Sequence, residues 1–240
     1  MIKTLLLLLK AGKLGKVWLS GGTMLLSVIA YSWIFGWWYA VGFVGLIFVH
    51  EMGHFIAARQ RGLDVGAPTF IPFVGAWVQL KDMPHNAETE AYVGIAGPLA
   101  GTLGALACFY LARNYDSRLL LALAYAGFFL NLFNLIPLSP FDGGRVTAVI
   151  SPKLWLIGVP ILVGLFFYRP SPLLILMAFI AAPQAWKAWQ VLRGVQTEEE
   201  QAYYLASAET RFAYGALYLG LAGFLAVMCH QLHEELPRAY

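Results

Sequence analysis

The 240-residue chain is 60% hydrophobic and only 12% charged, a composition that lies outside the usual range of soluble domains. Its net charge of +3 gives no indication of a nucleic-acid-binding surface. The apolar residues fall in long runs that approach the roughly 20 residues needed to cross a bilayer, so the composition predicts a polytopic membrane protein and argues against one whose main solvent is water.

The first 16 residues form a basic segment with a short leucine run between Lys3 and Lys10. This run is shorter than the apolar region of a secretory signal, and no clear cleavage site follows it. We therefore expect the segment 1–16 to be retained. Its lysines would suit an interfacial helix that lies on an anionic leaflet.

Seven apolar segments follow along the chain, at 17–35, 37–58, 91–112, 118–138, 153–168, 171–186 and 211–230. The fifth and sixth are short and flank the proline-containing stretch 169–172, so we expect them to form a hairpin. The predicted fold is an all-α polytopic membrane protein with about six to seven transmembrane helices. Residues 17–186 would form its transmembrane core, 187–210 a charged cytoplasmic connector, and 211–240 the last span and a short tail.

Between the second and third segments, residues 68–84 match neither a span nor an ordinary loop. The stretch is too apolar for water, and Pro68, Pro72 and Gly75 interrupt a run of β-forming residues. A short membrane-associated β-hairpin fits this pattern. Non-helical backbone at membrane depth is tolerated only where protein buries it or where it lines a wet cavity, and we expect the same here.

The basic residues are distributed unevenly about these segments. If the N-terminus is cytoplasmic, twelve of the 16 Lys and Arg residues fall on the cytoplasmic side, and the exceptions are Arg113, Arg118, Arg169 and Arg238. The positive-inside rule then predicts a multi-pass protein of the cell (inner) membrane with a cytoplasmic N-terminus. After seven spans the C-terminus would be external.

The second segment carries an H-E-x-x-H pattern, His50-Glu51-Met52-Gly53-His54. Histidines four residues apart lie one turn apart on one face of a helix, so the two imidazoles can share one metal. Glu51 can then accept a proton from water, which is the metallopeptidase arrangement. Titratable groups inside a span are costly and usually functional. The alternative interpretation is a chance match, or a pair of histidines hydrogen-bonded within the bundle.

A catalytic zinc usually has three protein ligands and keeps a fourth position for water, so the two histidines need a third partner. Asp142 is the best candidate, because it is one of only four aspartates and directly follows an apolar span. Pro137 and Pro140 would break the helix there, and Gly143 and Gly144 would permit a tight turn that aims the carboxylate back at the bundle. From its position alone Asp142 could equally be the N-cap of the next helix. The two histidines favour the metal.

Together these motifs resemble the site-2 protease family of intramembrane zinc metalloproteases. That family combines a helix-borne H-E-x-x-H with a downstream N-x-x-P-x-x-x-x-D-G, and the matching residues here are Asn134, Pro137, Asp142 and Gly143. The Gly97-Pro98 pair that opens the third segment, and the apolar hairpin before it, also resemble family features. The resemblance covers about residues 37–150.

The resemblance implies specific roles for five residues. The ligands of Zn²⁺ would be His50, His54 and Asp142, Glu51 would be the general base, and Asn134 would help to hold the substrate or its oxyanion. An alternative role for Asn134 is a hydrogen bond between helices.

The resemblance also implies a substrate class. The enzyme would hydrolyse peptide bonds within or near transmembrane segments of membrane proteins, at a site near the cytoplasmic side, with the substrate strand adding to the edge of the hairpin. Many relatives carry a PDZ-like insert or a C-terminal regulatory domain. This chain has no room for either, so we expect a compact core enzyme.

A transporter, or an ion or proton path, is a rival interpretation of the same polar cluster. Such a path needs polar groups at several depths, whereas the titratable groups here gather at one level. A catalytically silent relative is a further alternative, but a module that only binds has no need of Glu51. The sequence gives no prediction of the oligomeric state.

Overall fold

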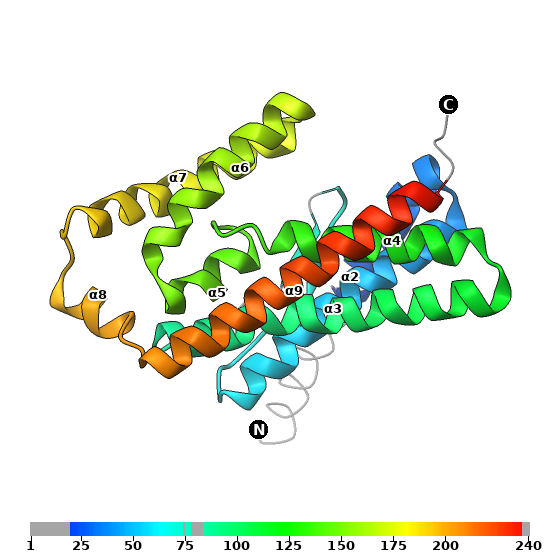
Figure 1. The fold of residues 1–240 in the computed structure, drawn as a ribbon. Coiled ribbons are helices and arrows are strands. Elements are labelled where there is room, and N and C mark those ends of the chain that lie inside the picture. The colour runs from blue at the N-terminus through cyan, green and yellow to red at the C-terminus, as the bar shows by residue number, and fades with distance from the viewer. Residues whose placement is uncertain (1–19, 74, 78–83, 237–240) are drawn as a thin grey trace, which may run out of the picture.

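The computed structural model describes residues 20–73, 75–77 and 84–236 (Figure 1). The expected interfacial segment 1–16 lies outside these residues, as do residue 74 and residues 78–83 of the predicted hairpin segment 68–84. The chain is mostly helical, and each of the seven apolar segments corresponds to a helix.

The helices and strands follow the expected order along the chain. They are a first helix Ser20–Phe35, α2 (Trp37–Gln60), β1 (Thr69–Ile71), β2 (Gly75–Trp77), α3 (Ala87–Tyr115), α4 (Arg118–Asn134), α5 (Asp142–Ile150), a 3₁₀ turn Pro152–Leu154, α6 (Trp155–Tyr168), α7 (Pro172–Leu192), α8 (Glu198–Tyr203) and α9 (Ala208–Glu235). Four of the described helices, α2, α3, α7 and α9, are long and apolar enough to cross a membrane. The first helix, α4 and α6 are apolar but shorter.

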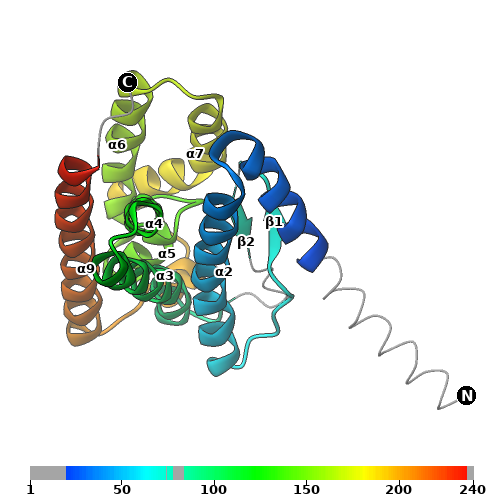
Figure 2. The ribbon, with the colours of Figure 1, turned by 90° about the vertical axis from the view of Figure 1, so that its right-hand side faces the viewer.

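Helix α3 is the centre of the packing, because it contacts α2, α4, α5 and α9. Figures 1 and 2 show α9 running along the outside of this group, while α6 and α7 form the expected hairpin, which projects away from it. Close approach between α2 and α3 depends on a small residue: a β-carbon on Gly53 would lie 2.3 Å from the carbonyl oxygen of Ala96. Such contacts are typical of helix pairs that pack in membranes.

The sequence predicts that Pro98 lies near the start of the third span. In the structure Pro98 instead lies inside α3. The helix begins eleven residues earlier, at Ala87, where the side chain of Asn86 accepts a hydrogen bond from the backbone N–H of Thr89. Asn86 is therefore the N-cap. Because a proline inside a helix cannot donate to the carbonyl four residues before it, the helix tolerates one missing hydrogen bond here.

The predicted hairpin is confirmed as a two-stranded antiparallel sheet in which Phe70 is paired with Ala76. The first helix supports it from the side of β1. The backbone N–H of Phe70 donates to Thr23 Oγ1, and that of Phe73 donates to the Tyr31 hydroxyl, each at 3.2 Å. The Phe73 ring also packs edge-on against Tyr31, with 5.0 Å between ring centroids.

The charged stretch before the last span contains a short helix, α8, that is bonded to its neighbours. Glu200 forms a 3.0 Å ion pair with Lys187 of α7, and the Lys187 ammonium lowers the pKa of that carboxyl. The Tyr203 hydroxyl donates to Glu90 of α3 at 2.7 Å. The stretch is thus attached to both α3 and α7.

Candidate metal centre

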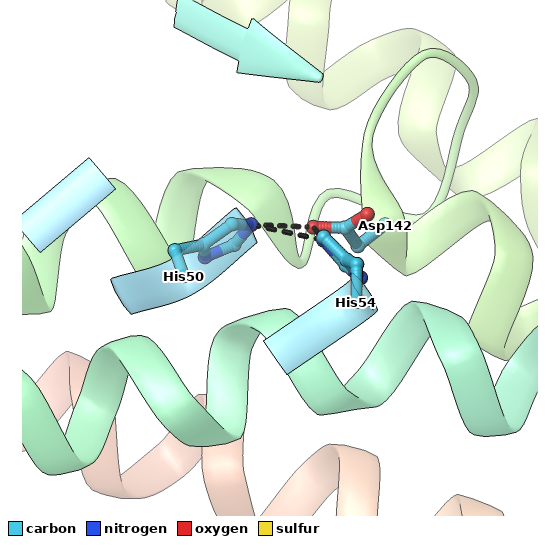
Figure 3. A group of neighbouring side chains, drawn as sticks. All are labelled: His50, His54 and Asp142. Atoms are coloured by element: carbon cyan, nitrogen blue, oxygen red, sulfur yellow. Dashed lines mark hydrogen bonds and ion pairs between the residues drawn. The ribbon is translucent and has the colours of Figure 1, made fainter. Parts of the chain in front are cut away.

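Three polar side chains from two distant parts of the chain meet inside the helical core (Figure 3). His50 and His54 lie on α2, and Asp142 is the first residue of α5. The Nε2 atoms of the histidines are 3.1 Å apart, and Asp142 Oδ2 lies 3.1 Å from that of His50 and 3.2 Å from that of His54. All three residues are buried, with at most 7% of their surface exposed.

The second nitrogen of each imidazole has its own partner. Nδ1 of His54 lies 2.8 Å from the carbonyl oxygen of Val93, and Nδ1 of His50 lies 2.8 Å from Asn131 Oδ1. A carbonyl oxygen only accepts, so Nδ1 of His54 carries a proton, and in the neutral ring the lone pair is then on Nε2. This is how metal-binding histidines are commonly oriented.

Asp142 is held in place by the packing of α5 on the loop before it. A β-carbon on Gly143 would lie 2.2 Å from the carbonyl oxygen of Leu135, and one on Gly144 would lie 2.7 Å from the carbonyl carbon of Leu138. Both glycines are helical, so they provide space for this contact and not the tight turn that we had expected. The break between α4 and α5 occurs at the predicted proline-containing stretch.

Asp142 does not act as a helix cap. The N-cap position belongs to Phe141, and in the described chain no side chain caps the start of α5. The carboxylate instead faces the two imidazoles, with the Arg145 guanidinium 4.0 Å from its other oxygen. The structure thus contradicts the alternative role that the sequence left open.

These three residues fit a divalent metal by the chemistry of their atoms. In the neutral ring with its proton on Nδ1, the Nε2 lone pair of His54 lies 3.2 Å from the Asp142 Oδ2 atom, and a divalent cation between these two acceptors would be bound by both. A tetrahedral zinc with bonds of about 2.0–2.2 Å would separate its ligand atoms by about 3.3–3.6 Å. A shift of a few tenths of an ångström therefore accommodates the ion.

Glu51 lies beside the first histidine on α2 and is 5% exposed. Its carboxylate makes no hydrogen bond to any of the residues described. The groups that act on it electrostatically are His54, His50, Asp142 and Arg145. An acceptor held next to the metal position, with its lone pairs free, is suited to accept a proton from water.

Asn134 lies at the last turn of α4 and is half-buried, with its Nδ2 donating to the Leu130 carbonyl at 3.1 Å. Within the described residues, no hydrogen bond joins it to His50, His54 or Asp142. The amide that contacts the site is Asn131, one turn earlier, which sequence reasoning missed. The only sequence signal for Asn131 was its polarity within an apolar run.

Comparison with known proteins relates the part of the chain that carries the two histidines to a known peptidase family. Residues 38–116, which include both histidines, match the model of peptidase family M50. A zinc metalloprotease of Methanocaldococcus jannaschii is 30% identical over 116 residues, which make up 46% of this chain and 33% of that protein. A Mycobacterium tuberculosis protein with the provisional name zinc metalloprotease Rip3 is 31% identical over 123 residues, 48% of this chain and 31% of the relative.

Among solved structures, the site-2 protease from Methanocaldococcus jannaschii aligns with a TM-score of 0.46 and 24% sequence identity. The alignment covers 73% of this chain and 88% of that one. The sequence matches span about a third of the length of the two curated relatives. The family match and these relatives confirm the resemblance to the site-2 proteases inferred from the motifs.

Proposed function

We propose that this chain, similar to peptidase family M50 over residues 38–116, is an intramembrane zinc metalloprotease that hydrolyses peptide bonds within or near transmembrane segments of other membrane proteins. The observation that carries the proposal is the convergence of His50, His54 and Asp142 within 3.2 Å of one another, beside Glu51. The relatives named as zinc metalloproteases support zinc as the metal.

In this proposal His50, His54 and Asp142 hold zinc, and Glu51 handles the proton. Zinc bound there would supply Lewis-acid chemistry that lowers the pKa of water into the neutral range. Glu51 accepts the proton from the attacking water and delivers it to the leaving amine. Burial of all four side chains limits competing solvent and strengthens each electrostatic interaction at the site.

Two further parts of the chain would act on the substrate. Asn134, eight residues before Asp142 and at the end of α4, would donate an amide N–H to the substrate carbonyl as negative charge develops on it. An unwound substrate strand would add to the β-hairpin. The N–H of Phe70 on β1 is already bonded to Thr23, which favours β2 as the pairing edge.

The proposed setting is a multi-pass protein of the cell (inner) membrane. The four long apolar helices support membrane insertion by length and composition, and the three shorter ones would raise the count to six or seven spans. The uneven basic residues favour a cytoplasmic N-terminus, with the metal centre near the cytoplasmic side. Residues 17–186 would be the core, with 187–210 as a cytoplasmic connector and 211–240 as the last span and tail.

An ion or proton path is the weaker candidate. It would need polar groups at successive depths, but the buried acidic and histidine residues of the described chain are His50, Glu51, His54 and Asp142, which gather in one place. A path also gives no reason for a glutamate directly beside two converging imidazoles. Peptide hydrolysis accounts for both.

The decisive experiment compares the purified native chain with Glu51→Gln on a panel of single-span membrane substrates. The proposal expects fragments with the native chain and their loss with Glu51→Gln at unchanged zinc content. If the native chain releases no fragment that depends on Glu51 from any substrate, while zinc-dependent ion flux appears in vesicles, the transport interpretation replaces the proposal.

A further inference from the structure

The amide of Asn131 lies behind the metal centre and is 1% exposed. We propose that Asn131 is a positioning residue that fixes the tautomer of His50, so that its Nε2 lone pair faces the metal. The inference rests on the proposed metal centre but concerns zinc affinity and not peptide hydrolysis. Asn131 would touch neither metal nor substrate.

The orientation of the amide follows from its two partners. Its Nδ2 lies 2.7 Å from the carbonyl oxygen of Gly127, one turn earlier on α4. Because a carbonyl oxygen cannot donate, the NH₂ group must face Gly127, and the amide oxygen must face His50. Nδ1 of His50, at 2.8 Å from that oxygen, can then only be the donor. The lone pair of the neutral ring is left on Nε2.

The space for this amide is provided by a glycine on the neighbouring helix. A β-carbon on Gly101 of α3 would lie 2.3 Å from Asn131 Oδ1 and 2.7 Å from Nδ2. Any larger residue would therefore push the amide away from His50. Gly101 and the carbonyl of Gly127 together confine the Asn131 side chain to one position.

The hydrogen bond from His50 to Asn131 should affect the zinc affinity of the site, which can be measured. Without Asn131 Oδ1, the Nδ1–H of a buried imidazole has no acceptor, and the ring can gain by turning or by moving its proton to Nε2. Either change removes a ligand atom from the metal. Groups that orient metal-binding histidines in this way typically contribute about 10–100-fold to metal affinity.

The test measures zinc dissociation constants by chelator competition, without substrate, on folded full-length protein. Asn131→Leu removes the acceptor at similar size and should weaken zinc binding by about 10–100-fold. Asn131→Asp keeps an oxygen toward His50 and should bind within a few-fold of native, although it loses the donor to Gly127. Gly101→Ala should resemble Asn131→Leu, because the added methyl displaces the amide.

Thr102→Val is the matched control. Thr102 is 5% exposed and donates to the Pro98 carbonyl within α3, so the change removes a buried hydrogen bond without touching His50. Its zinc affinity should stay native even where its thermal stability falls. The visible spectrum of Co²⁺-loaded protein provides a second readout, since its band intensities follow the coordination geometry. Asn131→Leu should change that spectrum and Thr102→Val should not.

Native zinc affinity in folded Asn131→Leu would overturn the inference, and so would equal weakening in Asn131→Leu and Asn131→Asp, which would indicate a packing role. Should Asn131→Leu not fold, Gly101→Ala takes its place in the comparison. Weaker zinc binding in Gly101→Ala than in Asn131→Asp would support the inference, and equal weakening in the two variants would overturn it. A chain that shows the expected affinities but cleaves no substrate would overturn the proposed protease and leave this inference standing.

Discussion

Gly97 lies against the imidazole of His54 so closely that a β-carbon on it would be 2.2 Å from Nε2. No side chain fits between α3 and the metal position at this level. The hydrogen-bonded orientation of His54 toward the Val93 carbonyl depends on the same close approach.

Gly97→Ala should therefore displace His54 and lower zinc affinity at least about tenfold, the lower end of the range for disturbed ligand orientation. Zinc titration of the purified variant measures the effect. Gly220→Ala on α9 is a matched control, since a β-carbon there meets nothing within 4 Å. Equal zinc affinity in both variants would mean that α3 moves aside and that the contact does not position His54.

Glu51→Gln should keep zinc and lose activity. The three metal-binding atoms are untouched, but the amide cannot accept the proton, and general acid–base catalysis typically contributes about 10²–10⁴-fold. Metal analysis and substrate cleavage on the same preparation test both halves. A variant that cleaves at the native rate would remove Glu51 from the proposed mechanism.

Asp142→Asn should weaken zinc binding and activity together. A neutral amide oxygen is a poorer ligand than a carboxylate and leaves the charge of the metal less compensated. Excess zinc should restore part of the activity, whereas it should not rescue Glu51→Gln. Full zinc occupancy with near-native cleavage in Asp142→Asn would leave the third ligand to be found elsewhere.

The topology prediction places the end of α9 outside the cell when the N-terminus is cytoplasmic and all seven apolar helices cross the membrane. A periplasmic-active reporter fused after Glu235 should be active, and a cytoplasmic reporter at the same position should be inactive. The reverse result would mean an even number of spans. The division of residues 153–186 into two separate spans, α6 and α7, would then be the first point to re-examine.

Several parts of this architecture could be predicted from the sequence because they depend on local patterns. The apolar runs predicted the helices, and the spacing of His50 and His54 predicted that they share a helix face. The carboxylate was identified from its motif and from its place after a proline-broken helix. Each of these signals lies within one continuous stretch of the chain.

Other features depend on contacts between helices, which the sequence does not mark. Asn131 was missed because a single amide in an apolar run could face any neighbour. Gly143 and Gly144 were expected to bend the chain, but they let α5 lie against the backbone of Leu135 and Leu138. Pro98 was expected near the start of a helix and lies within one.

The hydrogen bond from Phe70 to Thr23 has a consequence for self-association. An open strand edge is a template on which a second copy of the same chain can pair and begin to aggregate. On β1 the outward N–H of Phe70 already has an acceptor within the chain. The N–H of Phe73, in the turn after β1, likewise donates to the Tyr31 hydroxyl. The first helix thus protects one side of the hairpin against pairing between copies of the protein.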